Sequence, residues 1–199
     1  MESVPIVEDF FSGIDGRRLF LRHAAPERSR AVVILLHGYG EHGGRYLETM
    51  QRLAQARFAV YCPDHRGFGH SEVTPGDIEG IDLVTGDIHL LTKLAREQYP
   101  GDSIILIGHS MGGMLALNQL VHHQEEYDLA VVSGPAVLPP PGTHPLVAAL
   151  VGFVARFAPR LPVQKLDLSR GTRDPEMKAR DDADHTMYHG KVLARTGYE

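Results

Sequence analysis

Residues 103–113 read SIILIGHSMGG, an apolar run that passes through a Gly-x-Ser-x-Gly turn into a helix-forming stretch. This order predicts a buried strand, a sharp turn at Ser110 and a following helix, the arrangement called a nucleophile elbow. Gly108 and Gly112 are expected to flank the serine because larger side chains would collide where strand and helix approach each other. The turn should expose the Ser110 hydroxyl beside the first free N–H of the helix, that of Met111. A bystander serine in an ordinary glycine-rich turn is the alternative for this motif alone.

A second buried strand is predicted over residues 31–36, AVVILL, which run directly into the loop HGYG at 37–40. Unbroken apolarity is typical of a parallel strand that is covered on both faces. The loop after such a strand is where a second N–H donor beside the serine is expected, and the candidate is the N–H of Tyr39. His37 is assigned a structural role, because an imidazole at a strand end is commonly held by local hydrogen bonds. This second element favours the nucleophile over the bystander.

Further blocks stand in a fixed order along the chain. They are HGYGEH at 37–42 with Arg45 and Tyr46 beyond it, DHRGFGHS at 64–71, GHSMGG at 108–113, YHGK at 188–191 and ARTG at 194–197. With these blocks the chain resembles the α/β-hydrolase superfamily, and within it the monoacylglycerol lipase group. The resemblance spans essentially the whole chain and implies a serine hydrolase that acts on lipid esters.

The remaining pattern predicts an α/β fold. Expected are an antiparallel hairpin of 6–11 and 17–23, strands at 58–62 and 129–132, and helices at 46–56 and 81–99. Ile88, Leu91 and Leu94 should face the core from the second of these helices. Strand–helix alternation gives a mostly parallel sheet with helices on both faces, as in the α/β-hydrolase fold. We assign 1–134 to the hydrolase core and 135–199 to a cap or lid.

The late part of the chain lacks the elements that complete this chemistry. In the resembled fold an acid and then a histidine follow the serine, each on a loop after its own late strand. No apolar strand is predicted after 129–132, and His185 and His189 fall in the cap. We therefore expect the late strands and the triad's Asp and His to be absent from this chain. The sequence is then the N-terminal two thirds of a longer enzyme, and this chain is close to inactive.

The cap region begins with a proline-rich stretch over 135–145 that predicts an irregular connection. Residues 146–157 predict an apolar helix too short to span a bilayer. It is either an ordinary buried helix or a lid helix that makes a peripheral contact with a membrane or micelle, as the resemblance implies. The charged stretch 174–184 is expected to form a solvated outer face of the cap.

Composition excludes several classes of protein. A formal charge of -5 with no basic run argues against nucleic-acid binding. Cys62 is the only cysteine, which favours a reducing compartment. The N-terminus is acidic and has no apolar signal core, so a cytoplasmic location is expected, with or without membrane association. The histidines form no metal-ligand motif, so neither a metal nor a cofactor is expected.

The resemblance implies two-step acyl transfer on Ser110, with the N–H groups of Tyr39 and Met111 forming the oxyanion hole. Glu41, His42 and Arg45 are expected to line the rim of the site or to brace its loop. The substrate implied is a small ester of a single-chain lipid, and the oligomeric state stays open. The alternatives are a broad carboxylesterase or lysophospholipase with the same residues, and a non-catalytic binding protein that keeps the fold.

Overall fold

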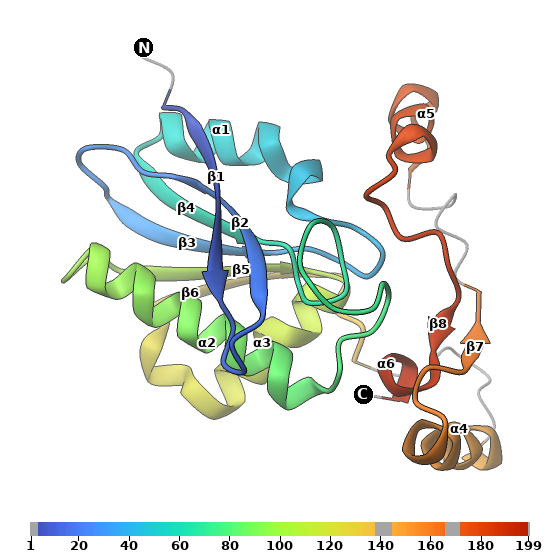
Figure 1. Ribbon diagram of the computed structural model, residues 1–199. Coiled ribbons are helices and arrows are strands. Elements are labelled where there is room, and N and C mark those ends of the chain that lie inside the picture. Colours follow the sequence, from blue (N-terminus) through green and yellow to red (C-terminus); the bar gives the residue numbers. More distant parts are fainter. Residues whose placement is uncertain (1–3, 138–144, 166–171, 199) are drawn as a thin grey trace.

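The computed structural model describes residues 4–137, 145–165 and 172–198, and its core is a six-stranded sheet (Figure 1). The strands lie in the order β1-β2-β4-β3-β5-β6. Their bounds are β1 Ile6–Ser12, β2 Arg18–Ala24, β3 Ala31–Leu36, β4 Phe58–Pro63, β5 Ile104–His109 and β6 Leu129–Ser133. The β1–β2 and β2–β4 pairs are antiparallel, while the pairs β4–β3, β3–β5 and β5–β6 are parallel. The predicted hairpin and mostly parallel sheet are confirmed.

Helices cover both faces of this sheet, as Figure 1 shows. Helix α1 (Leu47–Gln55) lies on one face, while α2 (Ile81–Gln98) and α3 (Met111–His123) lie on the other. Two short 3₁₀ helices, η1 (Gly43–Tyr46) and η2 (Gln124–Glu126), precede α1 and follow α3. Strand β3 is buried at every position, which explains its unbroken apolar sequence.

The predicted inward face of α2 is correct at its centre and wrong at its margin. Val84, Ile88, Leu91 and Ala95 are buried, whereas 41% of Leu94 is exposed. At 3.6 residues per turn, Leu94 lies about 90° around the helix from the centre of the buried face. Apolarity alone therefore overestimated the width of the buried stripe.

The outer edge strand of the sheet presents apolar side chains to solvent. Leu129 and Val131 of β6 are 56% and 48% exposed, although the neighbouring strand β5 pairs with them in register. Ala130 and Val132, on the opposite face, pack against the main core. An exposed apolar edge of this kind favours pairing with a further strand or self-association.

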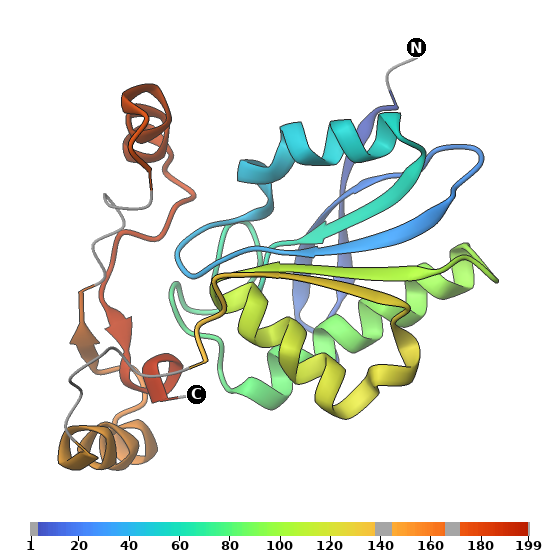
Figure 2. The same cartoon turned by 180° about the vertical axis from the view of Figure 1, so that it is seen from behind.

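The described part of the cap forms a separate group of elements beside the core, as both views show (Figures 1 and 2). Its elements are α4 Pro145–Phe157, β7 Pro162–Gln164, α5 Pro175–Ala183, β8 Val192–Leu193 and α6 Ala194–Tyr198. The antiparallel β7–β8 pair was not predicted, because two such short strands carry no periodic pattern. The predicted connection at 135–145 lies largely outside the described residues. None of the helices described combines the length and the apolarity that crossing a bilayer requires.

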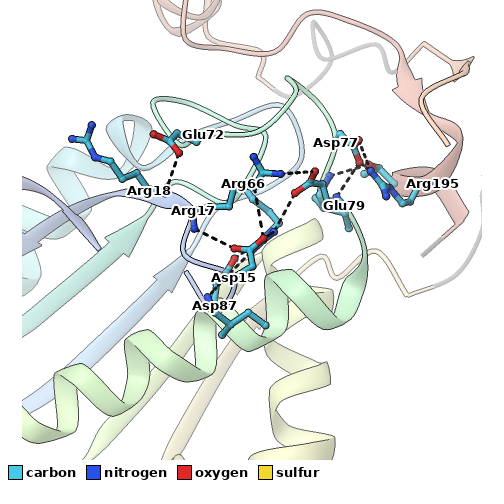
Figure 3. Close-up of polar contacts among 12 residues, drawn as sticks. Asp15, Arg17, Arg18, Arg66, Glu72, Asp77, Glu79, Asp87 and Arg195 are labelled. Atoms are coloured by element: carbon cyan, nitrogen blue, oxygen red, sulfur yellow. Dashed lines mark hydrogen bonds and ion pairs between the residues drawn. The ribbon is translucent and has the colours of Figure 1, made fainter. Parts of the chain in front are cut away.

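An ion-pair network attaches the base of the cap to the core (Figure 3). The fully buried carboxylate of Asp77 accepts hydrogen bonds from Arg195 Nη2 at 2.6 Å and from Arg160 Nε at 3.2 Å. Glu79, two residues on, lies 3.4 Å from Arg66 Nη1. Burial raises the pKa of Asp77, but the hydrogen bonds from Arg195 and Arg160 outweigh it and lower the pKa below its ordinary value. The cap base is therefore held by a carboxylate that stays ionised.

Candidate active site

Ser110 occupies a strained turn between β5 and α3. Its backbone has φ 52° and ψ -115°, a left-handed conformation that a residue with a side chain rarely adopts. Such a conformation costs about 1–3 kcal/mol and persists where the surrounding structure imposes it. The Ser110 N–H donates to Ser133 O at 2.9 Å, and Met114 N–H donates to Ser110 O at 3.0 Å, so both sides of the turn are fixed.

The two glycines of the elbow allow the backbones to approach closely. A Cβ on Gly108 would lie 2.2 Å from the carbonyl oxygen of Gly112, at the start of α3. A Cβ on Gly112 would lie 2.2 Å from Leu36 O and 2.6 Å from His37 O, at the end of β3. No side chain fits at either place, so this glycine spacing brings the serine turn against the loop after β3.

That loop supplies the second N–H group of the candidate site. A Cβ on Gly38 would lie 3.3 Å from Ser110 Cβ, so the loop passes directly beside the serine. Within the described residues, the N–H groups of Tyr39 and Met111 have no hydrogen-bond acceptor. Unpaired N–H groups in the residue after a serine and in the loop beside it are the elements from which an oxyanion hole is built.

His37 fixes the loop 37–40 through hydrogen bonds of its ring, as expected for a structural residue. The ring is fully buried. Its Nδ1 lies 2.8 Å from Gly38 O, and its Nε2 accepts the His65 N–H at 2.9 Å. Because Nε2 accepts, we assign the proton to Nδ1, which then donates to Gly38 O. Burial lowers the pKa of His37, so the imidazole is neutral. The same cause lowers the pKa of His65.

Glu41 and Arg45 were predicted to line the rim of the site or to brace its loop. In the structure they brace the loop 37–40. Glu41 Oε2 accepts the Gly38 N–H at 3.1 Å and the Tyr46 hydroxyl at 2.8 Å. Arg45 Nη1 donates to Glu41 Oε1 at 2.5 Å, and its Nη2 donates to Asp181 Oδ2 of α5 at 2.8 Å. The predicted rim residues therefore connect the loop to the cap.

His42 makes a second connection to the cap. Its Nδ1 accepts the Gly44 N–H at 3.1 Å, so its Nε2 carries the proton and lies 2.8 Å from Asp184 Oδ2. Thr186 Oγ1 lies 2.8 Å from the same Nε2 and donates to Asp184 Oδ1. The prediction of a solvated outer face over 174–184 is thus wrong at Asp181 and Asp184, because the Arg45 guanidinium binds the first carboxylate and the His42 Nε2–H binds the second.

Sequence reasoning missed the buried carboxylate of Asp64, which joins the loops under the site. It accepts the Gly43 N–H at 2.7 Å, the His70 N–H at 3.0 Å and Arg22 Nη1 at 3.0 Å. Its position directly after β4, in the block 64–71, was the signal that could have identified it. Through these hydrogen bonds, Asp64 fixes the loop 64–71 against the segment that contains His42 and Gly43.

The described residues hold a serine and its N–H groups without a general base. No side chain there makes a hydrogen bond with the Ser110 hydroxyl, and His109, the next residue, has its Nδ1 3.3 Å from Ser133 Oγ instead. In those same ranges, no three potential metal-binding side chains come together. A serine that acts as a nucleophile needs a proton acceptor, and the described residues place none at Ser110.

The pKa of Asp184 gives a test of the cap contact. Burial raises this pKa, but the hydrogen bonds from Thr186 and His42 outweigh it and lower it from the ordinary 3.8 to about 2. A lowered pKa means that the stabilisation is present above pH 3.8 and is lost as the pH falls through about 2. We expect NMR titration of the Asp184 carboxyl to give a midpoint near 2. A midpoint near 3.8 would show that the hydrogen bonds from Thr186 and His42 are not formed in solution.

The fold and this site define the class of the protein as an α/β-hydrolase. Residues 27–199 match the family model described as "Serine aminopeptidase, S33", and the chain belongs to that family. It is 36% identical over 188 residues to a monoacylglycerol lipase of Mycolicibacterium smegmatis, covering 94% of this chain and 67% of that protein. It is 29% identical to human monoglyceride lipase, covering 90% of this chain and 57% of that protein.

Solved structures agree with the fold. The crystal structure of the Paleococcus ferrophilus monoacylglycerol lipase is 27% identical, has a TM-score of 0.79, and matches 90% of this chain and 67% of its own. A soluble variant of the Saccharomyces cerevisiae monoglyceride lipase, in complex with a substrate analog, is 24% identical with a TM-score of 0.80 and matches 100% of this chain and 67% of its own. The chain thus spans between 57% and 67% of the lengths of these relatives.

Proposed function

We propose that the protein is a serine hydrolase that cleaves carboxylic esters of single-chain lipids, as a monoacylglycerol lipase does. The observation that carries this proposal is the strained turn at Ser110, with an unpaired N–H group at Met111 and another at Tyr39 in the adjacent loop. The names of the relatives support the choice of a lipid ester over other acyl compounds.

The proposed mechanism has two acyl-transfer steps. The Ser110 oxygen attacks the ester carbonyl while a histidine that acts as general base takes its proton, and the carbonyl oxygen becomes negative between the Tyr39 and Met111 N–H groups. The tetrahedral intermediate collapses, the C–O bond of the ester breaks, and the alcohol leaves with the proton from that histidine. Water then attacks the acyl-enzyme in the same way and releases the fatty acid.

The exposed face of α4 supports a peripheral contact with a membrane or micelle. Leu150, Phe153 and Phe157 are 60%, 63% and 68% exposed and lie on one side of the helix. The opposite side packs on α6, where a Cβ on Gly152 would lie 2.6 Å from the Tyr198 ring. Large apolar side chains on one exposed helix face are typical of helices that lie on a lipid surface.

We expect the 199-residue polypeptide to be close to inactive on p-nitrophenyl esters. A triad histidine removed from a comparable enzyme lowers turnover by about 10⁶. The measurement is a p-nitrophenyl ester assay on purified protein, with the Ser110→Ala variant as its control. Turnover that is lost in this variant would contradict the expectation and would point to His185 or His189 as the base.

Fluorophosphonate labelling of a longer form that includes the base separates an enzyme from a binding protein. Labelling that disappears in Ser110→Ala supports a serine hydrolase, whereas no labelling of a folded protein supports a non-catalytic binder. Comparing hydrolysis of monoacylglycerols, lysophospholipids and short-chain esters then distinguishes the lipase from a broad carboxylesterase or lysophospholipase, because these differ only in the leaving group.

A further inference from the structure

The loop that carries the Tyr39 N–H is held by the cap on both sides of that residue. On one side, the Tyr188 N–H donates to Gly40 O at 2.9 Å. On the other side, the Gly38 N–H donates to Glu41, which is paired with Arg45, which in turn donates to Asp181. Both Asp181 and Tyr188 belong to one short stretch of the cap.

Ring contacts from the same stretch restrict Tyr39 itself. The Tyr39 ring packs edge-to-face on Tyr188, with 5.9 Å between ring centroids, and on Phe68 of the core, with 5.2 Å between centroids. Edge-to-face pairs at these distances have a preferred orientation. A displacement of the cap stretch would therefore move the Tyr39 peptide, which follows Gly38 in the loop beside Ser110.

The series of polar contacts that runs from Asp181 through Arg45 and Glu41 to the loop has little freedom, because each of these side chains is mostly enclosed. The side chains of Arg45, Asp181 and Glu41 are 22%, 19% and 15% exposed. The planar guanidinium of Arg45 contacts both carboxylates, with one nitrogen on each. A lysine, with a single ammonium on a flexible stem, cannot reproduce this two-sided geometry.

We propose that Asp181 and Arg45 are positioning residues for the oxyanion hole, so that the cap stretch 181–188 sets the orientation of the Tyr39 N–H. This inference rests on the proposed function, since the N–H has a catalytic use only in an acyl-transfer enzyme. Asp181 acts through Arg45 and Glu41 and does not touch the substrate. The cap then does more than cover the site, because docking of 181–188 on the core completes the donor pair beside Ser110.

Backbone NMR of the 199-residue chain tests this coupling without any need for turnover. In Asp181→Asn we expect amide hydrogen exchange at Gly38 to be about two- to fivefold faster, with shifted amide resonances at Tyr39 and Gly40, because a partly exposed ion pair is lost. Arg45→Lys should give the same changes although it keeps the charge. Asp181→Glu, which keeps the carboxylate, should restore the slow exchange.

The matched control is Asp182→Asn, which removes the same charge from the next residue, an exposed position without a contact to the loop. It should leave the amides of Gly38, Tyr39 and Gly40 unchanged. Unchanged exchange at Gly38 in both Asp181→Asn and Arg45→Lys would overturn the proposal. Failure of fluorophosphonate labelling, with these NMR changes present, would instead reject the hydrolase function and leave the structural coupling intact.

Discussion

Replacement of Ser110 with alanine is expected to lower kcat for ester hydrolysis by about 10⁶ in a form of the protein that carries the general base. The reason is that the acyl-enzyme cannot form without the Ser110 hydroxyl as its nucleophile. The fold should be unaffected, because alanine has the same Cβ as serine and so meets the same backbone restriction at this turn. Initial rates on a monoacylglycerol, measured with the parent and the variant at equal concentration, give the ratio.

Ser133→Ala is the matched control for this measurement. Ser133 lies at the end of β6, its carbonyl accepts the Ser110 N–H, and its hydroxyl contacts only His109 in the described residues. Removing that hydroxyl should leave kcat within a few-fold of the parent. Equal losses in the two variants would mean that Ser110 acts through the structure of the turn and not as the nucleophile.

Replacement of Arg66 with methionine is expected to destabilise the protein by about 3–5 kcal/mol, because one partner of a buried ion pair is removed. Arg66 is fully buried, and its Nε and Nη2 donate to Asp87 at 2.7 and 2.9 Å. Burial raises the pKa of Asp87, and Arg66 offsets only part of that effect. Without the guanidinium, a buried carboxylate is left without its cation. Urea unfolding at neutral pH measures the change.

Arg52→Met provides the comparison. Arg52 forms an ion pair with Glu48 at 2.6 Å, but both side chains are almost fully exposed, so its loss should cost about 0.2–1 kcal/mol. A similar loss for Arg66→Met and Arg52→Met would show that the network of Figure 3 contributes no more than a surface pair.

The elements that local sequence patterns specify were predictable. The apolar runs of β3 and β5 and the glycine spacing around Ser110 encode the parallel strands and the turn, because each depends on residues adjacent in the chain. The proximity of Gly38 to Ser110 followed from fold topology, since the ends of neighbouring parallel strands meet at one edge of a sheet. The Tyr39 and Met111 donors stay a prediction until a ligand is seen between them.

The contacts between cap and core were not predictable in the same way. Asp181 and Asp184 lie in a strongly charged stretch that looks solvated in sequence, and only their partners Arg45 and His42, more than a hundred residues away, show why they turn inward. Asp77 likewise has no sequence signal for its pairing with Arg195. Such pairs depend on the relative placement of distant segments, which periodicity and turn chemistry do not encode.

The most direct test of the account is a crystal structure of the longer, base-containing form after reaction with a fluorophosphonate. The account predicts a covalent bond from phosphorus to Ser110 Oγ, with the phosphoryl oxygen about 2.7–3.1 Å from the backbone nitrogens of both Tyr39 and Met111. A phosphoryl oxygen that points away from these two nitrogens, or phosphorus attached to another residue, would contradict it.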